Sequence, residues 1–386
     1  SGSQRAALVP MFALFYVLLA PFVGAFADSL PKGRVMFISN AIKVVGCLMM
    51  LGGVHPLIAF AVVGLGAAAY SPAKYGILTE LLPPSQLVKA NGWIEGLTIA
   101  SIILGVLLGG QLVGPHLSPF LLALGLPGVE HPAEAALAAM ILIYGLAAAF
   151  NLAIPRTSAP LHELHAPVAL IQDFMRCNRR LWRDKLGQIS LGTTTLFWGV
   201  SGNLRYIVLA WAAAALGYST TQASSLVGVV AIGTAIGALV ASWCMKLDMA
   251  VKVIPLGTAM GLLILALNVI DNVWLAAPFL VLLGGLGGFL VVPMNALLQH
   301  RGHNLMGAGR SIAVQNFNEQ ACILLLGSMY AALTGFGLSA FAAISAFGLI
   351  VAGTMELIRR WHQGNLRWHA DEVERLLQIA RSDPSH

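Results

Sequence analysis

Charged residues are scarce in this chain of 386 residues. Asp, Glu, Lys and Arg make up 10% of it, while hydrophobic residues make up 58%. Soluble domains carry about 25% charged residues, so this composition excludes an ordinary soluble fold. The apolar stretches have the length that a helix needs to cross a membrane, about 20 residues. They also lack the alternation typical of a membrane β-barrel. The sequence therefore predicts an all-α integral membrane protein.

Several chemical motifs are also missing. The four cysteines lie far apart and form no CxxC pair, which argues against a disulfide framework or a zinc site. No histidine has the aspartate partner that a membrane acyltransferase would use to activate a hydroxyl. No nucleotide-binding P-loop is present, which disfavours an ATP-driven pump within the chain. We expect no cofactor and no metal, and the net charge of +6 does not indicate nucleic-acid binding.

The distribution of lysine and arginine predicts the topology. We expect eleven spans, at residues 7–28, 35–54, 57–79, 89–113, 134–154, 187–212, 222–245, 252–270, 273–298, 310–334 and 338–358. Loops with and without basic residues alternate along the whole chain, which places the C-terminus in the cytoplasm and residue 1 outside. The chain starts with Ser-Gly-Ser-Gln rather than Met. We therefore expect one further span upstream, making twelve in the full protein.

An internal repeat indicates two related halves. Gly66 and Pro72 are separated by five residues, and so are Gly287 and Pro293. The repeats lie six spans apart and so cross in the same direction, which predicts two parallel-related six-helix bundles with a substrate site between them. The predicted parts are an N-terminal bundle 1–154 that lacks its first span, a linker 155–186, a C-terminal bundle 187–361 and a cytoplasmic tail 362–386.

The linker and the tail each contain an amphipathic pattern. Residues 167–183 mix apolar side chains with arginines, which fits a helix on the anionic inner leaflet or, equally, a linker whose charge only fixes topology. Residues 366–379 predict a short structural helix in the cytoplasm.

The first predicted loop contains an aspartate followed by basic residues. The segment 24–34 resembles the signature loop of the major facilitator superfamily, in which Gly, three residues and Asp precede basic residues. Asp28 can pair with Arg34 and with a neighbouring helix terminus, so we predict a gate formed by Asp28, Lys32 and Arg34. The alternative is a charge cluster that only fixes orientation.

Two departures from that loop favour a narrower family. Ser29 replaces the usual basic residue and Pro31 the usual glycine. The chain is similar to the bacterial lysophospholipid transporter family over nearly its whole length, through the segments 27–29, 32–36, 66–78, 87–92, 293–299 and 312–316. The resemblance implies the major facilitator fold in the bacterial inner membrane. It also implies movement of lysophosphatidylethanolamine and related lysolipids to the inner leaflet, where an acyltransferase/acyl-carrier-protein synthetase re-acylates them.

The charges inside the predicted spans suggest how a lipid headgroup is held. They are Lys43, Lys74, Glu95, Arg205 and Glu319. Three positive charges against two negative ones leave an excess that suits a phosphate. We expect Lys74 and Arg205 to hold the phosphate, and Glu95 and Glu319 to orient them or receive the ethanolamine ammonium. Alternatively these charges form structural ion pairs, and Lys43 reaches the cytoplasmic interface instead.

Amides cluster in the same spans. We include Asn91, Asn203, Gln315 and Asn316 in the predicted substrate site. The alternative is that these side chains only join helices to one another.

A second hypothesis for the function of the whole chain is a major facilitator exporter of drugs or metabolites.

Overall fold

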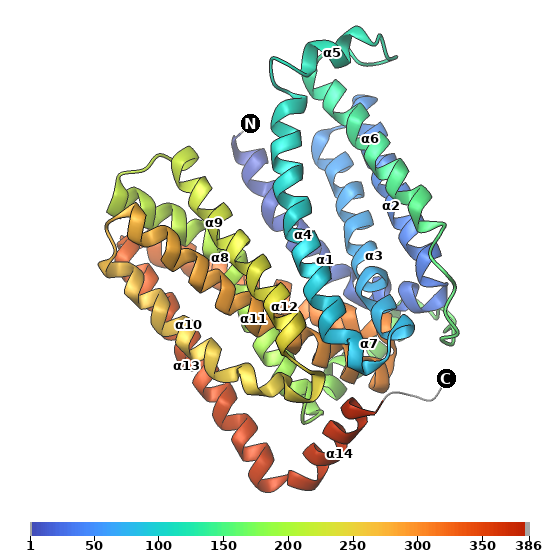
Figure 1. The fold of residues 1–386 in the computed structure, drawn as a ribbon. Helices are drawn as coiled ribbons and strands as arrows, with labels where there is room; N and C mark the ends of the chain where they lie inside the picture. The colour runs from blue at the N-terminus through green and yellow to red at the C-terminus, as the bar shows by residue number, and fades with distance from the viewer. Residues whose placement is uncertain (1, 383–386) are drawn as a thin grey trace. The chain divides into compact units, whose positions relative to one another are not determined.

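The structure is a computed structural model that describes the backbone of residues 2–382 and the side chains from residue 12. In this part of the chain every regular element is a helix (Figure 1). The elements are α1 (Gly2–Ser29), α2 (Lys32–Leu51), α3 (Pro56–Leu81), α4 (Pro84–Leu112), α5 (Ser118–Ala123), α6 (Pro132–Asn151), α7 (Pro167–Arg183), α8 (Gly187–Leu216), α9 (Thr220–Cys244), η1 (Leu247–Val253), α10 (Ile254–Ala266), η2 (Leu267–Val269), α11 (Val273–Met306), α12 (Ala308–Gly335), α13 (Ala340–Trp368) and α14 (Ala370–Arg381).

A helix occupies each of the eleven predicted spans. Within the described residues, nine helical segments are long and apolar enough to cross a membrane. The other two predicted spans correspond to α8 and α12, which have 30 and 28 residues but carry more polar side chains. Polar residues in spans of this length usually face a cavity or a partner helix. The short helix α5, in the loop between α4 and α6, was not predicted.

The helices pack into two compact units, and each takes one segment from the opposite half of the sequence. The first unit comprises Ser1–Leu81, Ser101–Asn178 and Met306–Phe317. Within it, α3 packs against α1 and α2, and α2 also packs against α6. The start of α12 belongs to this unit although it lies in the second half of the sequence. The predicted division into 1–154, 155–186, 187–361 and 362–386 stays a prediction.

The second unit comprises Leu82–Ala100, Arg179–Leu305 and Asn318–His386. Here α13 packs against α8 and α10, and α8 packs against α9. The predicted tail helix 366–379 is present only in part. Residues 366–368 end α13, and after a break at His369 the helix α14 follows, which packs on η1 and buries Val373 and Leu376.

The predicted linker helix is confirmed as α7. One of its faces is buried through Phe174, Cys177 and Leu181. The opposite face exposes Val168 and Met175 beside several arginines. The chain therefore crosses from the first unit to the second within an amphipathic helix.

Candidate functional site

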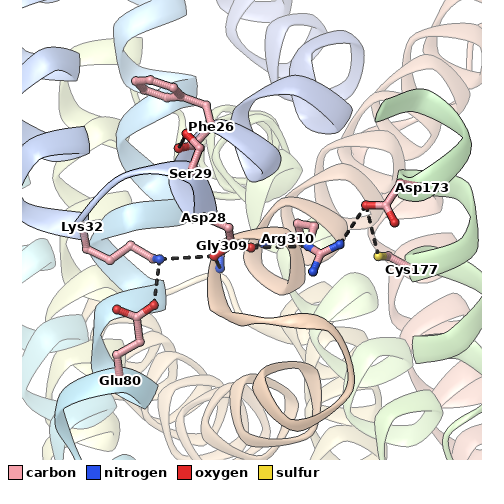
Figure 2. A network of polar contacts seen from close by, with 9 residues as sticks. All are labelled: Phe26, Asp28, Ser29, Lys32, Glu80, Asp173, Cys177, Gly309 and Arg310. Carbon is pink, nitrogen blue, oxygen red and sulfur yellow. Dashed lines mark hydrogen bonds and ion pairs between the residues drawn. The ribbon is translucent and has the colours of Figure 1, made fainter. Parts of the chain in front are cut away.

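A buried carboxylate lies at the end of α1, where this helix contacts the start of α12. The Asp28 side chain is only 4% exposed. Its Oδ1 accepts the backbone N–H of Gly309 at 2.9 Å, and its Oδ2 accepts that of Arg310 at 2.9 Å. Both donors lie in the first turn of α12, whose unpaired amide groups and dipole favour a negative charge (Figure 2). Asp28 therefore caps α12 from a helix 281 residues away in sequence.

The backbones of α1 and α12 can approach closely because small residues line their contact. A Cβ atom added to Gly24 would lie 2.7 Å from Cβ of Ala313, and one added to Gly309 would lie 2.7 Å from Cβ of Ala27. Distances below 3 Å mean that no larger residue fits without movement. This packing brings the α12 N-terminus within hydrogen-bonding reach of Asp28.

Further charges extend the cluster on both sides of Asp28 (Figure 2). Lys32 lies 3.2 Å from Asp28 and 2.7 Å from Glu80 at the end of α3, and all three side chains are almost fully buried. On the other side, Arg310 lies 2.9 Å from Asp173 of α7. We call Asp28, Lys32, Glu80, Arg310 and Asp173 the Asp28 network. It links α1, α2, α3, α7 and the start of α12 by ion pairs and hydrogen bonds.

The predicted pair of Asp28 with Arg34 is wrong. Arg34 is exposed, and among the described side chains it forms no ion pair. The α2 helix begins at Lys32, directly after Pro31. Arg34 therefore points about 200° around the helix from Lys32, at about 100° per residue. Lys32 forms the ion pair with Asp28 that was predicted for Arg34. The predicted contact of Asp28 with a helix terminus is confirmed.

In the first unit, the predicted substrate residues lie on α3 and at the start of α12. Lys74 is half-buried, with its Nζ 4.9 Å from the centroid of the Tyr75 ring. Asn316 donates a hydrogen bond to Oγ of Ser71 at 2.9 Å, and Gln315 is buried. One turn separates Ser71 from Lys74, so these polar groups share one stretch of the α3–α12 contact.

In the second unit, two predicted amides join helices. Asn91 and Gln299 exchange two hydrogen bonds of 2.9 Å between α4 and α11. Asn203 donates to the carbonyl oxygen of Ile323 on α12 at 3.1 Å. These contacts match the alternative in which amides hold helices together. The carboxylates of Glu95 and Glu319 are also buried, each at 7% exposure.

Arg205 differs from these residues because its side chain is exposed. It follows Ser201 by one turn of α8, on the same face of the helix. Ser201 lines a cavity between α8, α9, α10, α11 and α13 that is partly open to the surroundings. The lining is almost entirely apolar, with Thr234 as a second hydroxyl. Such a lining suits an apolar group.

Sequence reasoning did not select several charged residues that form ion pairs in the structure. Of the Asp28 network, Glu80 follows a predicted span, Arg310 is the first residue of one, and Asp173 lies in the predicted linker. Asp184 and Arg301 form a two-point ion pair, with distances of 2.8 and 2.9 Å, and both side chains are less than 8% exposed. A basic or acidic residue at a span end was the only signal, and it did not reveal the partner.

The sequence is similar to known membrane transporters. Residues 1–319 match the Major Facilitator Superfamily. The chain is 39% identical over 334 residues to the lysophospholipid transporter LplT of Pectobacterium carotovorum, covering 86% of this chain and 78% of that protein. It is also 39% identical over 328 residues to LplT of Yersinia pestis, covering 84% of this chain and 77% of the relative.

Solved structures share the fold at low sequence identity. The human organic anion transporter MFSD10 aligns with a TM-score of 0.71 at 14% identity, over 92% of this chain and 83% of its own. The fucose:proton symporter FucP of E. coli gives 0.71 at 12% identity, over 93% and 91%. The helices, the match to residues 1–319 and the two relatives agree. The chain belongs to the major facilitator superfamily and, within it, to the lysophospholipid transporter family.

Proposed function

We propose that this protein is a lysophospholipid transporter that moves lysophosphatidylethanolamine and related lysolipids across the bacterial inner membrane to its cytoplasmic leaflet. The observation that carries the proposal is the 39% identity to relatives named as lysophospholipid transporters, over 86% of the chain. The protein is a multi-pass membrane protein and a transporter by family, so its reaction is a movement and not a covalent change.

The transport cycle is alternating access, with the Asp28 network as a cytoplasmic gate. The buried carboxylate of Asp28 and the ion pair of Lys32 hold the ends of α1, α2 and α3 against the first turn of α12. Opening to the cytoplasm breaks these contacts. Arg34, which is exposed two residues after Lys32, is the third proposed member of the gate.

The headgroup is held by the charges inside the spans. Lys74 and Arg205 bind the phosphate, because their cations match its negative charge. Glu95 and Glu319 orient these cations or receive the ammonium of ethanolamine. The amides assigned to the site are Asn91, Asn203, Gln315 and Asn316. The apolar cavity that Ser201 helps to line, one turn before Arg205, supports a place for the single acyl chain.

The proposal also covers the orientation of the protein in the membrane and the enzyme that uses the transported lysolipid. The basic residues of the linker and the tail support a cytoplasmic C-terminus. A lysolipid delivered to the inner leaflet needs a second acyl chain before it is an ordinary phospholipid again. The functional partner is therefore an acyltransferase/acyl-carrier-protein synthetase that consumes the product of transport.

The test is the inward movement of labelled lysophosphatidylethanolamine in proteoliposomes, for the parent protein, Lys74→Ala and Arg205→Ala. We expect transport by the parent and its loss in both variants while the melting temperature stays unchanged. Lys252→Ala is the control, because Lys252 is exposed in η1. A folded parent that moves no lysolipid would contradict the proposed function. Transport that survives both substitutions would instead make Lys74 and Arg205 structural charges.

A further inference from the structure

A half-buried lysine of the first unit lies between aromatic rings. Lys43 is on α2, roughly 16 Å along the helix from Lys32 at about 1.5 Å per residue. Its Nζ lies 4.4 Å from the ring centroid of Tyr70 on α3 and 5.4 Å from that of Tyr144 on α6. The side chain therefore ends among the rings of two neighbouring helices, which does not fit a lysine that reaches for the cytoplasmic interface.

The α3 helix is shaped to receive this lysine. Gly66, Tyr70 and Lys74 follow one another at intervals of four residues, so they form one row on the helix surface. A Cβ atom added to Gly66 would lie 2.8 Å from Cγ of Lys43, so the glycine leaves room for the lysine stem. Tyr70 then contacts the ammonium group, and Lys74 follows one turn later in the same row of α3. The row of α3 that receives Lys43 thus also carries a second cation.

The charge of Lys43 is poorly compensated. Among the side chains that the structure describes, no carboxylate forms an ion pair with it. A lysine at the centre of a membrane costs roughly 3 kcal/mol on insertion scales, whereas a cation–π contact returns about 0.5–2 kcal/mol. An anion bound beside Lys43 would offset this cost.

We propose that Lys43, held between Tyr70 and Tyr144, is a second phosphate-binding residue beside Lys74, and that its ligand is the phosphodiester of a lysophospholipid. This inference rests on the proposed function and extends it. The two rings position the ammonium without neutralising its charge, so an N–H donor that does not face a ring can bind a phosphate oxygen. The ligand class is thereby restricted to single-chain lipids that carry a phosphate.

The test compares two lipids that differ in the phosphate. Radiolabelled lysophosphatidylethanolamine and radiolabelled monoacylglycerol with the same acyl chain are titrated onto the purified protein in a scintillation proximity assay. The variants are Lys43→Gln, which removes the charge, and Lys43→Arg, which keeps it. Lys252→Gln is the matched control, because it removes an exposed lysine from η1. Melting temperatures establish that each variant is folded.

We expect Lys43→Gln to weaken lysophosphatidylethanolamine binding about tenfold or more, the loss of one charge-assisted hydrogen bond. Its affinity for monoacylglycerol should stay the same, and Lys43→Arg should lie close to the parent. Unchanged binding of lysophosphatidylethanolamine in Lys43→Gln, or an equal loss for both lipids, would overturn the proposal.

A second variant decides the matter if Lys43→Gln does not fold. Tyr144→Leu removes one of the two rings and should selectively weaken the phosphate-bearing lipid, and equal effects on both lipids would overturn the proposal. Measurements on the parent protein distinguish a failure of this inference from a failure of the proposed function. A parent that transports the lysolipid while Lys43→Gln binds it normally refutes only this inference. A parent that neither binds nor transports it refutes the proposed function as well.

Discussion

Replacing Asp28 by asparagine removes the central charge of the Asp28 network with little change in shape. The carboxylate accepts two backbone N–H groups and pairs with Lys32. Asparagine keeps one acceptor oxygen, so one N–H in the first turn of α12 loses its partner, and Lys32 keeps only Glu80. A hydrogen bond to a charged group contributes about 1.5–3 kcal/mol, and a charge at a helix N-terminus about 0.3–1 kcal/mol. The contact between α1 and α12 should therefore lose about 2–4 kcal/mol, or roughly 30- to 700-fold in its equilibrium constant.

A native thiol reports on this contact. Cys177 on α7 is 4% exposed and lies next to Asp173, which pairs with Arg310 of the network (Figure 2). Separation of α12 from α1 moves Arg310 and so loosens α7. We expect Asp28→Asn to raise the rate of Cys177 alkylation by N-ethylmaleimide at least tenfold. Peptide mass spectrometry measures this rate separately from that of the other cysteines.

The control is Glu374→Gln, a neutralisation on the exposed surface of α14, which should leave the Cys177 rate unchanged. Cys244 is already exposed and serves as an internal standard for reagent activity. Equal Cys177 rates in Asp28→Asn and the parent, with both proteins folded, would refute the role of the carboxylate in holding α12. An increase at buried Cys47 and at Cys322 as well would instead mean general unfolding.

Three further substitutions test other parts of the structure. Asp184→Asn should lower the unfolding free energy by about 3–5 kcal/mol, because it leaves the buried guanidinium of Arg301 without its carboxylate, and thermal melting in detergent measures the loss. Gly237→Ala should destabilise by about 1–3 kcal/mol because its Cβ overlaps backbone atoms of α11, whereas Gly96→Ala, with 3.5 Å to its nearest neighbour, should melt like the parent. Val230→Phe should partly fill the apolar cavity and slow transport of long-chain lysolipids more than short-chain ones; an equal effect on both would argue against an acyl-chain site there.

The spans were predictable because the membrane imposes a simple rule on composition. A helix that crosses the hydrocarbon must be apolar and about 20 residues long, and the loops record orientation in their lysines and arginines. All eleven predicted spans contain a helix, and the amphipathic pattern at 167–183 matches α7 residue for residue. The apolarity rule is weakest for α8 and α12, where the polar residues that suggest function also reduce the signal.

Pairings between distant residues could not be predicted in the same way. Asn91 and Gln299 are 208 residues apart, and Asp28 and Gly309 are 281 apart. Each pair depends on how two helices are rotated and spaced, and that depends on small residues at the contact. Gly24 and Gly309 are visible in the sequence, but a glycine in a span is common and does not identify its neighbour. The sequence therefore indicated which residues are polar inside the membrane, and the structure was needed to show which of them meet.

The two departures from the superfamily loop now have a physical explanation. Ser29 donates its hydroxyl hydrogen to the carbonyl oxygen of Phe26 at 2.7 Å, and so satisfies a backbone acceptor at the end of α1. Pro31 precedes the first residue of α2, and its carbonyl oxygen accepts the N–H groups of Arg34 and Val35. Because α2 begins at Lys32, this lysine is fixed in the first turn, four residues after Asp28 and within reach of Glu80. Replacing Pro31 by glycine would free that turn, so this departure fixes which basic residue joins the network.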